Sequence, residues 1–273
     1  MVGVAHEFAP DGTQIGRATL WDQQGNATKI TGLGDLFANP WGINSSGTYV
    51  GLTRVVIGPN AGQRGTFVGR DGWAVPMSYP GYDLTRAYDI NDDGWIVGVY
   101  NQPGTFTPHR GYVAKAFDTE IRDLGLLDDP LVNGVWPHEI NNAGEIVGAA
   151  TSGNAFRIAL YWPAGATEPI DLNTVVSIPG ETRLVEAMDI NNSGQILARG
   201  FNGYYILTPR RLPVLHDPYL NAAGLEGAGP ISSAYSTVAR VPEPVAGATA
   251  ICGTVAALAR RRGRYPRTAM HGR

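Results

Sequence analysis

The chain has 273 residues with 36 glycines and 19 prolines, and only 16% of its residues are charged. This turn-rich composition disfavours long helices and predicts many short strands in a packed domain. The residues before Pro242 include 15 basic and 23 acidic side chains, a net charge of about −8, so we expect no nucleic-acid partner. The single cysteine, Cys252, excludes an internal disulfide.

A short motif recurs along the chain. Its Ile-Asn pairs begin at Ile43, Ile90, Ile140 and Ile190, in steps of 47, 50 and 50 residues. A glycine follows each asparagine after two residues, and two of the four copies continue into Ile-Val-Gly. The repeated pairs are Asn44 with Gly47, Asn91 with Gly94, Asn141 with Gly144, and Asn191 with Gly194.

This Ile-Asn-x-x-Gly motif predicts a turn between two strands. Asparagine bonds to its own backbone two residues on, and glycine adopts positive φ without a Cβ clash. In one copy, Asp89, Asn91 and Asp93 have the spacing of the first half of a calcium loop. The twelfth position of that loop is Tyr100 rather than glutamate, so we favour a structural turn and keep a calcium site as the alternative.

The repeats predict an all-β domain over residues 1–212, a β-propeller-like array of about five units of 48–50 residues. Radial repetition of small sheets leaves few exposed edges, which favours propeller blades over a flat sandwich. The expected units cover residues 1–38, 39–86, 87–134, 135–184 and 185–212.

The pattern Asp-Ile-Asn-x-x-Gly-x-Ile-Val-Gly, followed by a Gly/aromatic run and a closing Asp-Leu-Gly, resembles the HAF family of bacterial extracellular repeats. The usual His-Ala-Phe triplet is present only loosely, as Asn154-Ala-Phe156. The resemblance implies an extracellular placement and a repeat architecture, and it supplies no catalytic residue or cofactor.

The beginning of the chain carries no signal-peptide pattern, and Met1-Val-Gly3 aligns with Tyr49-Val-Gly51 inside a repeat. We therefore expect that Met1 is an internal or misassigned start, and that the natural protein begins upstream with a signal peptide.

The end of the chain has a different composition. Residues 213–240 are rich in Pro, Gly, Ala and Ser and predict a linker. Residues 241–264 then combine Pro242-Glu243-Pro244, an apolar run over 245–259 and the basic cluster Arg260-Arg261-Arg262, before a basic tail at 265–273.

This order of features resembles the PEP-CTERM sorting signal, which implies an exosortase as processing partner and transient anchoring in the inner membrane. The apolar run predicts a short helix of about 22 Å, less than a stable membrane span needs. A packed or amphipathic helix that ends in arginines is the alternative.

No catalytic motif stands out. His138-Glu139 lacks the second histidine of a zinc protease, and Gly32-Leu-Gly34 lacks the third glycine of a dinucleotide site. Trp95, Trp136 and Trp162 fall on or beside predicted strands. Such aromatics fill cores, whereas an exposed set on one face would indicate carbohydrate stacking.

The sequence thus predicts an exported, non-enzymatic protein of the cell envelope or extracellular matrix, a binding or structural module with surface polysaccharide as a candidate partner. The alternative is an extracellular enzyme that acts on glycans or peptides through residues on its loops.

Overall fold

In the computed structural model, residues 1–8, 11–12, 14–33, 36–55, 64–101, 109–152, 155–209 and 235–241 are described. Regular structure in these ranges is β, apart from the single 3-10 turn η1 (Leu172–Thr174). The prediction of an all-β chain is confirmed. In this part of the chain no helix is long and apolar enough to cross a membrane. The helix expected at 245–259 lies outside the described residues.

Nineteen strands form five antiparallel sheets, and in each sheet the strands follow one another in chain order. The first sheet contains β1 (Val2–Phe8), β2 (Gln14–Trp21) and β3 (Ala27–Lys29). The second contains β4 (Leu36–Ile43), β5 (Tyr49–Val55), β6 (Arg64–Arg70) and β7 (Trp73–Pro76). The third contains β8 (Asp83–Ile90), β9 (Trp95–Asn101), β10 (Arg110–Lys115) and β11 (Ile121–Asp123). The fourth contains β12 (Gly134–Ile140), β13 (Ile146–Ser152), β14 (Ala155–Trp162) and β15 (Ile170–Asp171). The fifth contains β16 (Leu184–Ile190), β17 (Ile196–Gly200), β18 (Tyr204–Pro209) and β19 (Tyr235–Val241).

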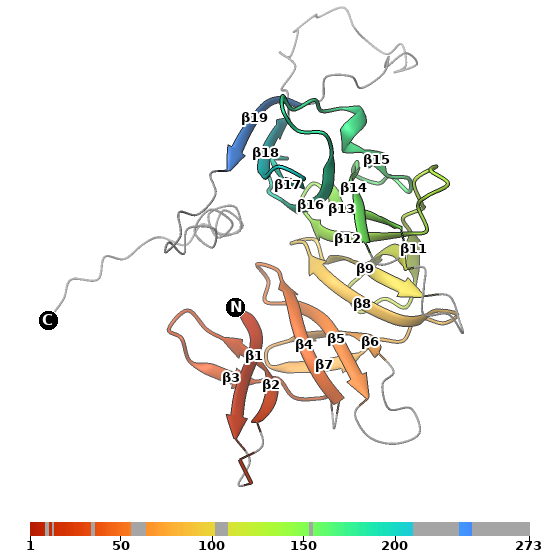
Figure 1. Cartoon of the computed structure of the whole chain (residues 1–273). Coiled ribbons are helices and arrows are strands. Elements are labelled where there is room, and N and C mark those ends of the chain that lie inside the picture. Colours follow the sequence, from red (N-terminus) through yellow and green to blue (C-terminus); the bar gives the residue numbers. More distant parts are fainter. Residues whose placement is uncertain are drawn as a thin grey trace, which may run out of the picture.

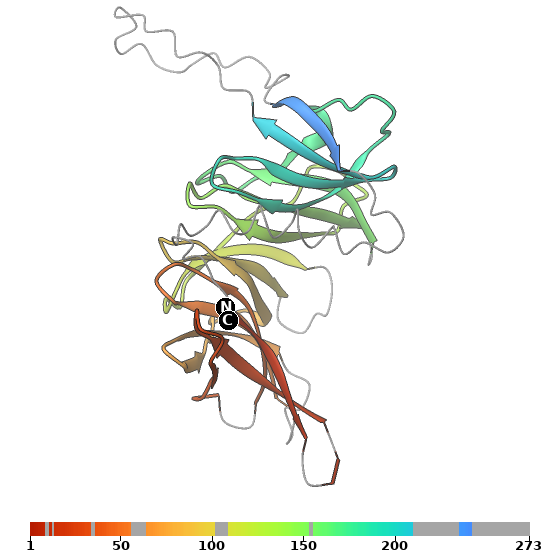
Figure 2. The ribbon, with the colours of Figure 1, turned by 90° about the vertical axis from the view of Figure 1, so that its left-hand side faces the viewer.

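The sheets follow one another in space as they do in sequence, from β1–β3 at one end to β16–β19 at the other (Figure 1). Figure 2 shows the same row of stacked sheets from the side. The first strand of each later sheet packs against the sheet before it, as β8 does against β4, β5 and β6. Among the described elements, extensive contacts join only sheets that are consecutive in the chain.

The Ile-Asn motif lies at the same place in four sheets, where the first strand turns into the second. β1 holds the place of a second strand, in agreement with the alignment of Val2-Gly3 with the later repeats. The region expected to be a linker contains β19, which pairs with β18 so that Val241 lies opposite Tyr204. The fifth sheet therefore draws its outer strand from residues that directly precede Pro242.

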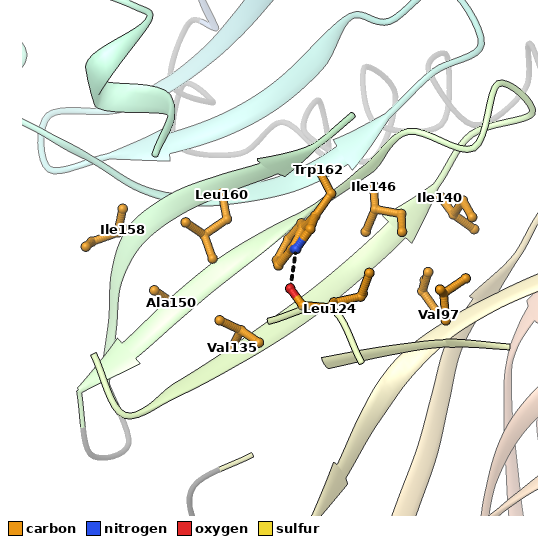
Figure 3. Packing of buried hydrophobic residues seen from close by; sticks show 10 residues of the cluster. Val97, Leu124, Val135, Ile140, Ile146, Ala150, Ile158, Leu160 and Trp162 are labelled. Carbon is orange, nitrogen blue, oxygen red and sulfur yellow. Dashed lines mark hydrogen bonds between the residues drawn. The ribbon is translucent and has the colours of Figure 1, made fainter. Parts of the chain in front are cut away.

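Each junction between sheets is filled by apolar side chains from both partners. In the fourth sheet the central residue is Trp162, which is fully buried among Ile146, Leu160 and Val135 (Figure 3). Val97 of the third sheet and Leu124, which directly follows β11, belong to the same cluster. The Trp162 indole nitrogen donates a 2.8 Å hydrogen bond to the Leu124 carbonyl oxygen. The expectation that this tryptophan fills a core is confirmed.

The glycine that ends the Ile-Val-Gly run has a steric cause. The first strands carry register shifts, for example between Ala87 and Asp89. A main-chain oxygen of the first strand lies close to the second strand at these glycines. A Cβ at Gly98 would lie 1.9 Å from the Arg86 oxygen, and one at Gly148 would lie 2.0 Å from the Trp136 oxygen. A side chain at these positions would therefore separate the two strands.

Candidate functional site

The asparagine of the repeated motif holds its own turn closed. In the third sheet, Asn91 Oδ1 accepts a 2.8 Å hydrogen bond from the Trp95 amide, and the Asn91 carbonyl oxygen accepts one from Gly94. Gly94 has a φ of 78°, and the equivalent glycines 47, 144 and 194 have φ between 75° and 83°. The predicted turn, with its asparagine bonds and left-handed glycine, is present in all four copies.

The amide nitrogen of the same asparagine reaches the next sheet. Asn44 Nδ2 donates to the Asn91 oxygen at 3.0 Å, Asn91 Nδ2 to the Asn141 oxygen at 3.1 Å, and Asn141 Nδ2 to the Asn191 oxygen at 3.2 Å. Asn91, Asn141 and Asn191 are buried, so a donor left without an acceptor there would be costly. We call these three bonds the asparagine ladder. They are sequence-distant contacts that the motif alone did not predict.

A second row of bonds runs beside the ladder on the exposed side of the turns. The Ser45 amide donates to Asp92 Oδ1, the Asp92 amide to Asn142 Oδ1, and the Asn142 amide to Asn192 Oδ1. Each bond joins residues that are equivalent in successive repeats. The turns of four sheets are thus connected twice, once in the interior and once at the surface.

The residues considered for calcium have structural partners. Asp89 is buried, and its Oδ2 accepts a 3.0 Å hydrogen bond from the Ile140 amide of the fourth sheet. Both polar atoms of the Asn91 side chain serve the turn and the ladder. The Asp93 main-chain oxygen accepts from Lys115 Nζ. The described residues include no group of three or more His, Cys, Asp or Glu side chains placed to hold a metal ion.

Aromatic rings form a column along the first strands of the second, third and fourth sheets. Trp41 stacks on Tyr88 with ring centroids 5.1 Å apart, and Tyr88 stacks on Trp136 at 6.0 Å. His109 meets Trp136 edge to face at 4.6 Å, and the Arg86 guanidinium lies 5.9 Å from the same ring. Because these rings cover one another, the column joins sheets and does not offer a free row of ring faces.

Two carboxylates are held by cations. Glu186 lies 3.3 Å from His138 Nε2 and accepts two contacts from Arg199, at 3.0 and 2.9 Å. Burial alone would raise the pKa of Glu186, but the hydrogen bonds and charges of His138 and Arg199 lower it. Each of these residues belongs to a first or second strand, so the cluster connects the fourth sheet to the fifth.

Asp123 of β11 binds Arg110 through two bonds, at 3.1 and 2.8 Å, and also accepts from Tyr100 Oη and the Gly125 amide. Burial acts to raise the pKa of Asp123, yet the bonds from Arg110, Tyr100 and Gly125 outweigh it and lower the pKa. Burial and the neighbouring carboxylate raise the pKa of the Tyr100 phenol. This cluster joins β9, β10 and β11 in the outer part of the third sheet.

A cavity with a volume of about 450 Å³ lies between the third and fourth sheets. Its rim carries Trp95, Lys115, Asp118, Glu120 and Arg122, all of which are exposed. The three tryptophans singled out in the sequence therefore have different positions. Trp162 is in a core, Trp136 belongs to the aromatic column, and Trp95 lies at the cavity rim with 41% of its surface exposed.

The charged rim residues were not predicted from the sequence. They come from β10, β11 and the loop between these strands, where they resemble ordinary surface charges. The only sequence signal for this rim was Trp95, a tryptophan that directly follows the turn glycine in a single repeat. The sorting-signal residues Pro242, Glu243, Pro244, Arg260, Arg261 and Arg262 lie outside the described residues.

No family model matches the chain, and a search of curated proteins found no match.

Proposed function

We propose that the chain is an exported protein of the cell envelope or extracellular matrix, whose repeat array acts as a non-enzymatic binding or structural module. The observation that supports this role is the asparagine ladder, because the residues that recur in every full repeat are used to join sheets. Residues shared by all repeats therefore have a scaffold role. Particular functions are left to positions where single repeats differ.

The sheets are proposed to act as propeller-like blades. Each is a meander, and the first strand of each later sheet packs on the preceding sheet, as in blades arranged around an axis. The polar and aromatic clusters at the junctions then serve to fix the angle between neighbouring blades.

Export is proposed on the likeness of residues 241–264 to a PEP-CTERM signal, with an exosortase-type enzyme as processing partner. The position of β19 is compatible with removal of this tail. Val241 is the last residue of the fifth sheet, so a cut beyond it would leave every described strand in place.

The test compares the full chain, expressed in a host with an exosortase and behind a signal peptide, with a variant that lacks residues 242–264. This deletion begins after β19 and so preserves the fifth sheet. A second variant replaces Arg260, Arg261 and Arg262 by glutamine, which keeps the length of the tail.

We expect the full chain to lose its C-terminal segment and reach the envelope or medium, while both variants fail to be processed. Mass spectrometry and cell fractionation measure these outcomes. Equal processing and placement of all three proteins would contradict the sorting role.

A further inference from the structure

The cavity between the third and fourth sheets occurs where one repeat departs from the others. The position after the turn glycine is Glu145 in the fourth sheet and Gln195 in the fifth. Glu145 binds Asn141 Nδ2 and Tyr161 Oη, and Gln195 binds Asn191 Nδ2 and Thr208 Oγ1. In these two repeats a polar side chain thus folds back and closes the turn against the third strand.

Trp95 holds this position in the third sheet and forms no such closure. Its indole is 41% exposed and lies on the cavity rim. Lys115 of β10 is directly opposite Trp95 in the strand register, and its Nζ is 4.7 Å from the indole centroid. This exposed ring beside a cation is therefore specific to one repeat and is not required by the fold that the repeats share.

The cavity combines an apolar floor with a polar rim. Ile121, Ile140 and Ile146 contribute to the floor. The loop that carries Asp118 is folded by bonds from the Thr119 and Glu120 amides to its carboxylate. On the other side, Arg122 Nη1 donates a 3.0 Å hydrogen bond to the Gly165 oxygen of the fourth sheet. Parts of both sheets are thus held in place around the opening.

The charges on the rim balance, because the two cations Lys115 and Arg122 line the same cavity as the two carboxylates Asp118 and Glu120. A strongly anionic ligand would meet two carboxylates, and a purely apolar ligand would form no hydrogen bonds with the four charged groups of the rim. A sugar ring suits both features. Its C–H face packs on an indole, and its hydroxyls accept from the cations and donate to the carboxylates. The volume of about 450 Å³ is in the range of small-ligand sites, roughly 300–1,000 Å³.

We propose that this cavity binds a neutral saccharide unit of a polysaccharide. Trp95 is the stacking platform, and Asp118, Glu120, Lys115 and Arg122 direct the hydroxyl groups. The proposal rests on the binding role proposed above and assigns it a site and a ligand class.

The test is affinity electrophoresis of the purified full chain in gels that contain soluble glucan, mannan, galactan or xylan, with polygalacturonate as an acidic arm. We expect at least one neutral polysaccharide to retard the protein. Trp95→Gln should weaken that retardation by about tenfold or more. The variant should fold, because glutamine occupies the equivalent position 195 of the fifth repeat.

Trp73→Gln is the matched control, since Trp73 is 60% exposed and lies in β7, away from the cavity. It should bind as the parent does. Glu120→Gln is a second variant, which alters an exposed rim carboxylate, and it should weaken retardation without lowering the melting temperature.

Three results would overturn the proposal: no retardation by any neutral polysaccharide, retardation by polygalacturonate alone, or retardation that survives both Trp95→Gln and Glu120→Gln. Binding by purified protein does not depend on export. If the tail is processed as proposed but no neutral glycan binds, only the ligand assignment fails. If glycan binds but the tail is not processed, only the sorting role fails.

Discussion

Asn91 Nδ2 donates a 3.1 Å hydrogen bond to the main-chain oxygen of Asn141, the residue that occupies the same place in the next repeat. The two positions are 50 residues apart, and both side chains are buried. One asparagine therefore closes a turn with its oxygen and joins two sheets with its nitrogen.

Removal of this side chain should destabilise the array. We expect Asn91→Ala to lower the free energy of unfolding by about 1–3 kcal/mol, because the partly buried Trp95 amide and the buried Asn141 oxygen each lose a partner. The control is Asn192→Ala, which removes an exposed acceptor of the surface row and should cost roughly 0.5 kcal/mol or less. Urea unfolding measures both. Equal losses in the two variants would contradict the interior role of the ladder.

The close approach of strands at Gly98 makes a second prediction. Gly98→Ala would place a Cβ 1.9 Å from the Arg86 oxygen, so the strands must move apart at a cost of about 1–3 kcal/mol. The fifth repeat already has Ala198 at the equivalent position, and Ala198→Gly there should cost only about 0.5–1 kcal/mol through backbone entropy. Thermal unfolding ranks the two variants, and the reverse order would show that the steric reason is wrong.

Trp162 should be the most sensitive side chain of the fourth sheet. Trp162→Ala would open a cavity in a fully buried cluster, at a cost of about 3–5 kcal/mol. Trp162→Phe keeps most of the apolar volume but leaves the Leu124 oxygen without its donor, at a cost of roughly 1–3 kcal/mol. Phe201→Ala is the control, since this ring is 70% exposed. A phenylalanine variant as stable as the parent would mean that the hydrogen bond contributes little.

The Asp123 cluster predicts a loss of stability in acid. The folded pKa of Asp123 lies below its ordinary value of 3.8, so its contribution is present above that value. This contribution is lost as the pH falls through the lower, folded pKa. Asp123→Asn should therefore be less stable than the parent at pH 7 by about 1–2 kcal/mol, and the difference should shrink below about pH 4.

Urea midpoints at several pH values measure this difference. Arg110→Lys keeps the charge but loses the two-bond geometry, and it should show a smaller deficit with the same pH dependence. A deficit that is constant from pH 7 to pH 3 would contradict the titration of Asp123.

The repeated turns could be predicted because their cause is local. Asn91 and Gly94 lie within one tetrapeptide, and the residue types alone specify the bond and the positive φ. The interior bond from Asn91 to Asn141 could not be predicted in the same way. It depends on the relative placement of two sheets, which no short window of sequence contains.

β19 was missed for a related reason. Its neighbours are rich in Pro, Gly, Ala and Ser, which favoured a linker. The run Tyr235-Ser-Thr-Val-Ala-Arg-Val241 contains the β-branched residues of a strand, and three fifth-sheet strands left room for a fourth. The cavity was missed because its rim joins Trp95 with charges from a different hairpin, and only folding brings them together.

The arrangement of the sheets in a row also determines how local unfolding spreads through the array. Because each sheet has extensive contacts only with its neighbours in the chain, the described array behaves as a one-dimensional series of coupled units. Loosening of the third sheet would uncouple the first two sheets from the last two. Each pair would then unfold as a separate block. This loosening would also open the cavity beside Trp95. A saccharide bound in this cavity, as proposed above, would therefore stabilise the contact between the third and fourth sheets.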